Sequence, residues 1–432
     1  MKAKAYKLKK ELGLFQATLY GVGIILGAGI YVLIGTGAGI AGNAIWLSFA
    51  IAAIIAAFTG MSYAELSSMY SKDAAEYVYT KNAFKKPALA FAVEWIMVFA
   101  LIVSGATVAL GFGGYFSHIF GIPQIIAAII LIIILSLVNY IGIKESAKFN
   151  VLSTGIEILG LVIISIIGLF FIGKGGVDFF YSPQGMTGIF SATAIIFFAY
   201  IGFDELVNFS EETKNAKKVM PRALLISLVI STVLYMLVAV SAVSILGWEK
   251  LSESKAPLTE VVSSVYPNGA VIMSIIALFA TSNTVLGILI VTSRLFYGLS
   301  SNHSLPEVCR RIGIRGTPYM AILLVMILSI LALAVGGIKE IAMLTDIGIF
   351  IVYIFVNMSV IALRYARPAA VRGFKSPVNI GKFPVFALLG IIASGFMLLH
   401  FSIYLLLLEL TIITIGFAVY LAYSHAKKQS MY

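Results

Sequence analysis

Apolar stretches long enough to cross a lipid bilayer recur along the whole chain, and no other feature of the sequence constrains its fold as strongly. A membrane-spanning helix needs roughly 20 mostly apolar residues, and it satisfies its backbone polar groups internally. Of the 432 residues, 60% are hydrophobic and only 11% are charged, and the mean hydropathy is +1.03. A soluble protein of this length needs far more polar surface. We therefore predict an all-α polytopic membrane protein.

Twelve such stretches are predicted to span the membrane, and they leave no room for a separate soluble domain. The first is too long for the apolar region of a signal peptide, and eleven more follow it, so we expect it to be a retained helix. The predicted spans lie near residues 14–39, 44–70, 88–116, 123–141, 151–173, 187–210, 222–246, 268–299, 318–336, 340–365, 383–400 and 402–424.

The basic residues are distributed so unevenly that they predict an orientation. If the N-terminus lies inside the cell, the outer loops hold only four of the 30 Lys and Arg residues, namely Lys174, Lys250, Lys255 and Lys339. Cytoplasmic segments carry an excess of Lys and Arg, so we predict that both termini are cytoplasmic and that the protein lies in the plasma membrane. The net charge of +11 then reflects topology, and we expect no nucleic-acid partner.

Residues that would support enzyme chemistry are scarce. The single cysteine, Cys309, excludes an intramolecular disulfide, and the four histidines are scattered. No Cys/His cluster has the spacing of a metal site, and no Ser–His–Asp or nucleotide-binding set is visible. We therefore expect a protein that is not an enzyme and that uses neither a cofactor nor a metal.

Two of the predicted spans contain residues that interrupt a membrane helix. The first carries Gly21, Gly23, Gly27 and Gly29 within nine residues, and the sixth carries Gly202 just before an acid in an apolar segment. Close helix packing would explain two of the glycines in the first span, but four at this spacing favour a break. Non-helical backbone at membrane depth is tolerated only where it lines a cavity or is buried in protein. Two interrupted spans in corresponding positions point to a transporter binding site.

The positions of the two interruptions divide the chain into repeats. Spans 1–5 and 6–10 are expected to form two inverted five-helix repeats, with two further helices after them. The predicted segments are a cytoplasmic N-terminal tail (1–13), the first repeat (14–173), an extracellular loop (174–186), the second repeat (187–365), a loop with helices 11 and 12 (366–424) and a cytoplasmic C-terminal tail (425–432).

Several short motifs follow one another over nearly the whole chain. They are Gly21–Tyr31, Tyr63–Leu66, Tyr140–Ser146, Phe197–Asp204, Glu211–Asn215 with Pro221 and Arg222, Ser293–Tyr297 with Leu305 and Pro306, and Arg372–Phe374. With these motifs the chain resembles the permeases of the amino acid–polyamine–organocation (APC) superfamily, near its cationic amino acid transporter branch. The resemblance implies an inverted-repeat secondary transporter that carries a small-molecule amino acid across the bilayer by alternating access.

The resemblance also implies how an amino acid is held between the two breaks. The substrate α-carboxylate would lie at the start of the outer half of the first helix, near Gly27, Ala28, Gly29 and Ile30. The α-amine would lie at carbonyl groups freed by the breaks, near Ile25, Phe198, Ala199 and Ile201. Electrostatics supports this placement, because the N-terminus of a half-helix attracts an anion.

The expected side walls of this pocket are apolar or neutral. They comprise Val103, Thr107, Phe203, Asn283 and Thr284, besides Phe198. Thr107 and Asn283 are expected to be either helix-packing polar groups or ligands. Glu94, the one acid of the third span, lies nearer the inner face, as a solvated or paired group or as a pocket residue. These walls favour a neutral amino acid over a cationic amino acid or a polyamine.

An acid stands in the fifth span where many members of the superfamily carry a lysine in place of a sodium ion. Glu157 lies eleven residues after Ser146. An ionisable residue within a span is a functional hypothesis by default. A buried carboxyl group without a partner can carry a proton, a carboxylate can bind a cation, and a carboxylate near the helix end can simply reach water. We predict ion coupling at Glu157, through protons, or else an exchanger.

Two other classes of function stay open at this point, a channel and a membrane receptor. A channel would use a ring of carbonyls or charges and usually an oligomeric symmetry. One chain with two broken helices needs neither, so a transporter is favoured.

Overall fold

The computed structural model describes residues 13–70, 75–141, 143–174, 176–207, 213–301 and 305–429. Most of the predicted N-terminal tail (1–13), the end of the predicted C-terminal tail (425–432), and the motif residues Glu211 and Glu212 lie outside these residues.

The described chain consists of helices joined by loops, and its only strands form one short hairpin. Its helices are α1 (Leu14–Ala41), α2 (Ile45–Met69), α3 (Ala75–Phe84), α4 (Pro87–Phe120), α5 (Gln124–Ile141), α6 (Ile143–Leu169), α7 (Gly185–Ile196), α8 (Ala216–Leu246), α9 (Trp248–Glu253), α10 (Pro257–Val265), α11 (Gly269–Ser301), α12 (Tyr319–Ala332), α13 (Ile338–Ala366), α14 (Val385–Leu398) and α15 (Ile403–Gln429). Short 3-10 turns form η1 (Gly42–Ala44), η2 (Phe197–Tyr200) and η4 (Glu307–Arg310). The strands β1 (Asn379–Ile380) and β2 (Phe383–Pro384) pair antiparallel, with Asn379 opposite Pro384.

The lengths and compositions of these helices confirm a polytopic all-helical class. Within the described residues, nine helical segments are long and apolar enough to cross a membrane, and one of them, Leu14–Met69, contains both α1 and α2. Two shorter apolar helices, α12 and α14, accompany them.

The outer faces of the helices are apolar, as a bilayer requires. On α5, for example, Ala128 and Ile132 are fully buried, whereas Ile130 and Leu137 are 47% and 57% exposed. A surface helix in water would carry polar residues on its outer side. The protein is therefore a multi-pass membrane protein.

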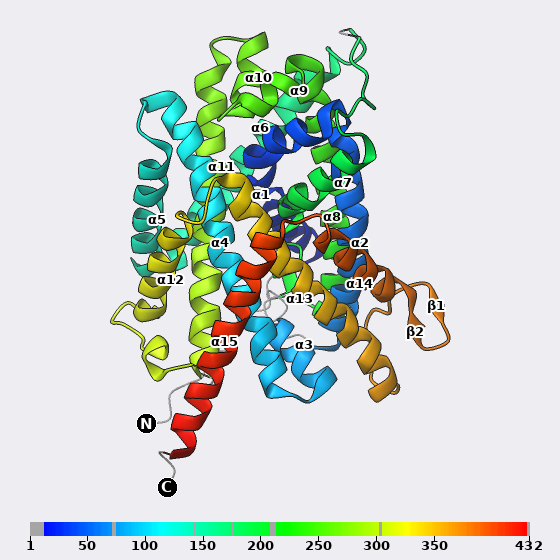
Figure 1. Ribbon diagram of the computed structural model, residues 1–432, viewed down its shortest axis with the longest axis vertical. Helices are drawn as coiled ribbons and strands as arrows, with labels where there is room; N and C mark the ends of the chain where they lie inside the picture. Colours follow the sequence, from blue (N-terminus) through cyan, green and yellow to red (C-terminus); the bar gives the residue numbers. More distant parts are fainter. Residues whose placement is uncertain are drawn as a thin grey trace.

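Helix α1 runs through the interior of the bundle, where it packs against α7, α8 and α11. Its residues Leu26, Ile30 and Leu33 are fully buried. Around it, α5 and α12 lie on one side and α2 and α14 on the other (Figure 1). The short helices α9 and α10 lie at one end of the bundle, and α3 lies toward the opposite end (Figure 1). The interior position of α1 brings its break to the centre of the protein.

Both predicted interruptions are present in the structure. Helix α1 is kinked at Gly27, whose backbone is not helical (φ 0°, ψ −169°). After α7 and η2, Ile201 is also non-helical (φ −60°, ψ 134°), and Gly202 has φ +122°. The other glycines of α1 serve close packing instead; a Cβ on Gly23, for example, would overlap Thr154 of α6. Both explanations of the glycines therefore hold, for different residues: Gly27 forms the break, and Gly23 allows close helix packing.

The helices differ from the predicted spans mainly in the short segments that lie outside them. Helix α6 runs from Ile143 to Leu169, and its membrane-crossing part, Leu152–Leu169, begins at the start of the predicted span 151–173 and ends four residues before its end. The predicted span 187–210 corresponds to the apolar segment Gly185–Val207, which is continuous helix only up to Tyr200, because the backbone turns at 201–204 where the interruption was predicted. The short helices α3, α9 and α10 were not predicted, since each is too short or too polar to register as a span.

A buried ion pair joins two long helices near the end at which α3 lies. Glu65 of α2 accepts hydrogen bonds from Arg364 of α13, at 2.7 Å from Nε and 2.5 Å from Nη2. Arg372 Nε adds a contact of 3.0 Å and the backbone N–H of Ser376 one of 2.9 Å. All four donors bond the carboxylate of Glu65. This residue therefore fixes the end of α13, and the chain that follows it, to α2.

Candidate substrate-binding site

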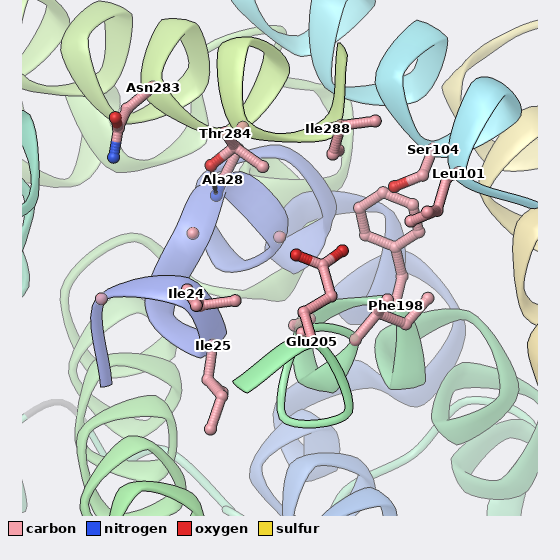
Figure 2. A pocket seen from close by; sticks show the side chains of 17 residues that line it. Ile24, Ile25, Ala28, Leu101, Ser104, Phe198, Glu205, Asn283, Thr284 and Ile288 are labelled. Carbon is pink, nitrogen blue, oxygen red and sulfur yellow. Dashed lines mark hydrogen bonds between the residues drawn. The ribbon is translucent and has the colours of Figure 1, made fainter. Parts of the chain in front are cut away.

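A cavity lies where the two interruptions meet α4 and α11. Its wall contains backbone of α1 around Gly27, backbone of the η2 region around Ala199, and side chains of the two neighbouring helices. Figure 2 shows Ser104 of α4, together with Asn283 and Thr284 of α11, among the side chains that line it. A site built largely from backbone can bind the groups common to a class of small molecules.

The outer half of α1 begins at this cavity. The first N–H groups of a helix have no partner within the helix. That of Ala28 donates to Thr284 Oγ1 at 3.0 Å, and the same hydroxyl lies 3.1 Å from the carbonyl oxygen of Ala280, to which it donates. A Cβ on Gly27 would lie 3.1 Å from Thr284 Oγ1. Glycine at the kink therefore lets Thr284 reach the end of the half-helix, next to the cavity.

The two interrupted segments touch each other directly. A Cβ on Gly29 would lie 2.5 Å from the Cα atom of Ala199, and a Cβ on Gly202 would lie 2.7 Å from Ile24 Cγ2. Gly202 also has φ +122°, a backbone conformation that favours glycine. Each of these contacts leaves no room for a side chain, so the close approach of the two breaks depends on both glycines.

A tyrosine of α8 holds the two breaks together. The hydroxyl of Tyr235 lies within hydrogen-bonding distance of the carbonyl oxygens of Ile25, at 2.5 Å, and Ala199, at 2.8 Å. Its single proton can be donated to either oxygen. Both carbonyls belong to the set that the family resemblance assigned to the substrate amine.

Most of the predicted site residues line the cavity, and four do not. Those in its wall are Ile25, Gly27, Ala28, Gly29, Phe198, Ala199, Ile201 and Asn283. Thr284, also expected in the wall, lies there too. Asn283 further donates from Nδ2 to Thr154 Oγ1 at 3.4 Å, so it links α11 to α6.

The four others are buried elsewhere in the bundle. Thr107 donates to the carbonyl of Val103 at 3.1 Å, within α4. On this helix the cavity is lined by Leu101 and Ser104, because a shift of one residue turns a side chain by about 100°. Phe203 packs its ring against Tyr63 and Tyr353, at centroid distances of 5.8 and 5.5 Å, and Ile30 is fully buried in α1.

An acid that the sequence did not place in the pocket lines the cavity. Glu205 follows the break of the sixth span, and Figure 2 shows its carboxylate directed into the cavity. The expectation of apolar or neutral walls is therefore wrong. The position of Glu205 directly after the break was the one sign in the sequence that it could face the cavity. The direction of its side chain, however, depends on the non-helical backbone at Ile201 and Gly202.

Glu157 lies outside the cavity wall, deep in α6. Its side chain is fully buried, and neither carboxyl oxygen has a hydrogen-bond partner among the described residues. The alternative in which it reaches water is therefore wrong. Its own carbonyl oxygen accepts the hydroxyl of Tyr31 at 2.8 Å. Thr154, the partner of Asn283, lies one turn before it on α6, which connects its helix to the cavity wall.

A second group of acids lies between α3 and α4. Glu94 is 1% exposed and accepts the backbone N–H of Tyr77 at 3.2 Å, so it is a paired, buried residue and not a pocket residue. Glu76 of α3 accepts the hydroxyl of Tyr63 at 2.8 Å. Burial, followed by the nearby charges of Glu94 and Asp204, raises the pKa of Glu76 to about 8. Tyr63, which bonds Glu76, also packs against the ring of Phe203, so this cluster contacts the segment at the break of the sixth span.

Comparison with known proteins places this geometry in context. A sequence profile described as amino acid permease matches residues 12–423. The branched-chain amino acid permease BcaP of Bacillus subtilis is 29% identical, over 97% of this chain and 94% of its own length. A vacuolar cationic amino acid transporter 4 of Arabidopsis thaliana is 29% identical over 85% of the chain and 65% of its own length. The methylthioribose transporter of Bacillus subtilis is 28% identical over 87% of this chain and 86% of its own length.

Proposed function

Because the chain belongs to the amino acid permease family, we propose that it is a secondary transporter that moves an α-amino acid across the membrane by alternating access. The observation that carries this proposal is the meeting of the two breaks at one cavity. The N-terminus of the outer half-helix at Gly27 attracts an anion, and the carbonyl oxygens of Ile25 and Ala199 attract an ammonium group. An amino acid carries both charges on one carbon atom, which matches a site with both ends close together.

The proposed topology follows from the helices and from the charge distribution. Counting α1 and α2 separately, and adding α12 and α14 to the long segments, gives the twelve spans expected from the sequence. We assign residues 14–173 and 187–365 to two inverted five-helix repeats, each of which starts with an interrupted span. The end of the bundle with α9 and α10 then faces outward, because the loops assigned to that side hold only four of the 30 Lys and Arg residues, Lys250 and Lys255 among them. We place the protein in the plasma membrane with both termini in the cytoplasm.

Glu157 is the proposed site of ion coupling. Its carboxyl group is fully buried and has no hydrogen-bond partner in the described part of the chain. Such a group is stable in the membrane interior only when it is protonated or pairs with a cation. A proton that binds when the site opens outward and leaves when it opens inward would couple transport to the proton gradient. An exchanger that carries an amino acid in both directions would not need this step.

The side chain of the substrate is not fixed by the family. The relatives include a branched-chain amino acid permease, a cationic amino acid transporter and a methylthioribose transporter. The preference for a neutral amino acid rested on walls without charge, and Glu205 adds a charge to them. The choice between neutral and cationic side chains therefore turns on this residue.

Uptake by the purified protein in liposomes tests the proposal. Unlabelled α-amino acids should compete for uptake of a labelled amino acid, and the matching amines without the α-carboxyl group should compete at least about tenfold less, given one lost ion contact at the half-helix. Methylthioribose and a polyamine belong in the same panel. If the amines compete as well as the amino acids, the proposed function is wrong, and a polyamine or another organic cation becomes the better substrate.

A further inference from the structure

Glu205 is the only ionisable side chain among the described residues that line the cavity. Its neighbours Asp204 and Leu206 are buried, whereas Glu205 itself is only partly buried. Figure 2 shows its carboxylate extending from the backbone of the sixth span toward the space between α1 and α11. A molecule bound in this cavity therefore meets one acidic side chain.

Among the residues that the structure describes, the rest of the cavity wall holds no basic side chain that could neutralise this acid. Its polar side chains are the hydroxyls of Ser104 and Thr284 and the amide of Asn283. A carboxylate withdrawn from bulk water without a counter-ion is unfavourable, and a cation that enters the cavity removes this cost. The adjacent acid does not share the role, because Asp204 is fully buried and its Oδ1 accepts the backbone N–H of Gly202 at 2.9 Å.

The two ends of a bound amino acid already have partners in the backbone. In the proposed function, its α-carboxylate faces the N-terminus of the outer half-helix, and its α-ammonium faces the carbonyls of Ile25 and Ala199, which Tyr235 holds together. With a neutral amino acid in a closed site, Glu205 either remains an uncompensated charge or has to take up a proton, and both are unfavourable compared with pairing to a cation. An amino acid with a cationic side chain brings the missing positive charge.

We propose that Glu205 is the counter-ion for a positively charged side chain of the substrate, so that the protein prefers cationic amino acids to neutral ones. This inference rests on the proposed function and adds the substrate class to it. Two effects contribute to this specificity. A cationic side chain gains a charged partner, and a neutral side chain leaves the acid of Glu205 unpaired.

Pairs of substrates that differ in charge but hardly in size test the inference on the unaltered protein. Arginine is compared with citrulline, and lysine with norleucine, as competitors of uptake and as stabilisers in thermal unfolding of the purified protein. The charged member of each pair should bind about thirtyfold more tightly or better, the effect of leaving one partner of a buried charge pair uncompensated. Equal binding of arginine and citrulline would overturn the inference.

Two substitutions assign the preference to Glu205. Glu205→Gln keeps the size but removes the charge, and it should weaken arginine about thirtyfold while changing citrulline by less than about threefold. Glu205→Asp keeps the charge, so arginine should still bind more tightly than citrulline. Glu253→Gln, an exposed acid on α9, serves as the control and should leave both affinities unchanged.

The outcomes separate this inference from the proposed function. If Glu205→Gln retains the preference for arginine, or weakens arginine and citrulline equally, Glu205 does not bind the side chain. If the wild-type protein binds neutral amino acids more tightly than cationic ones, and binding still requires the α-carboxyl group, only this inference fails. If the α-carboxyl group is not needed by any substrate, the proposed function itself fails. Should Glu205→Gln not fold, the isosteric pairs and Glu205→Asp decide the question.

Discussion

The hydroxyl oxygen of Tyr235 lies 2.8 Å from the carbonyl oxygen of Ala199. This hydroxyl also contacts the carbonyl oxygen of Ile25, in the other broken segment, at 2.5 Å. One side chain of α8 thus contacts the backbone of both interruptions. Because the two carbonyls lie at the proposed amine site, Tyr235 connects the position of helix α8 to the geometry of the substrate pocket. A movement of either broken segment has to break or rearrange this contact.

Tyr235→Phe removes this contact without changing the shape of the ring. We expect the free energy of unfolding to fall by about 1–2 kcal/mol, because one buried hydrogen bond is lost. Substrate affinity should fall about tenfold, which corresponds to ~1.4 kcal/mol, since the carbonyls are no longer held in place. Thermal unfolding and uptake kinetics measure the two effects. Tyr266→Phe, at a residue 62% exposed, is the control, and equal behaviour of the two variants would exclude the bridging role.

Glu157→Gln tests the coupling site. Uptake by the wild-type protein should depend on an imposed pH gradient and need no sodium, whereas the variant should lose the dependence on pH, because an amide cannot carry a proton. Glu409→Gln changes another buried acid, in α15 and outside the ten helices of the two proposed repeats, and it should keep the wild-type profile. A Glu157→Gln protein with the wild-type pH profile would remove Glu157 from the mechanism.

Gly29→Ala tests the contact between the two breaks. The added methyl group would overlap the backbone of Ala199, and backbone cannot move aside as a flexible side chain can. We expect a loss of stability of about 1–3 kcal/mol from overpacking, together with loss of uptake. Gly298→Ala is the matched control, because a Cβ there meets no atom within 4 Å in the described part of the chain. It should stabilise α11 by up to about 1 kcal/mol, and an equal effect of both changes would refute the close-contact argument.

Glu65→Gln tests the buried ion pair between α2 and α13. It leaves Arg364, which is 3% exposed, without its carboxylate, and a buried charge that loses its partner costs about 3–5 kcal/mol. Glu307→Gln breaks a pair with Arg310 at the surface, where Glu307 is 58% and Arg310 40% exposed, and such pairs contribute about 1 kcal/mol or less. Thermal unfolding of both variants in detergent should therefore show a large shift only for Glu65→Gln.

The raised pKa of Glu76 predicts a pH dependence of stability. Below about pH 4.5 this carboxyl group is protonated in both the folded and the unfolded state, so it has no effect on their difference. Between that pH and its folded pKa of about 8, only the unfolded state ionises, and stability falls as the pH rises, by at most ~1.4 kcal/mol per pH unit. Glu76→Gln should gain stability over the wild type across this range and show a constant difference above it. A difference that does not change between pH 5 and pH 9 would contradict the assignment.

The membrane class and the two interruptions could be predicted from the sequence, because both arise from local properties. Hydropathy over about 20 residues decides whether a segment can cross the bilayer. The kink at Gly27 and the left-handed backbone at Gly202 need glycine or polar residues in an otherwise apolar segment, which the sequence displays directly. The motifs around them also led to the amino acid permease family, which the profile match confirmed.

Only the tertiary structure decided which side chains face the cavity. The predictions on α4 chose Val103 and Thr107, whereas Leu101 and Ser104 line it, because hydropathy does not fix the rotation of a helix that is apolar on all sides. The direction of Glu205 follows from non-helical backbone at the break, and the contacts of Tyr235 and Thr284 join segments far apart in the chain. The sequence by itself therefore determined that two helices break and where. The packing of the other helices around those breaks determined which groups a substrate meets there.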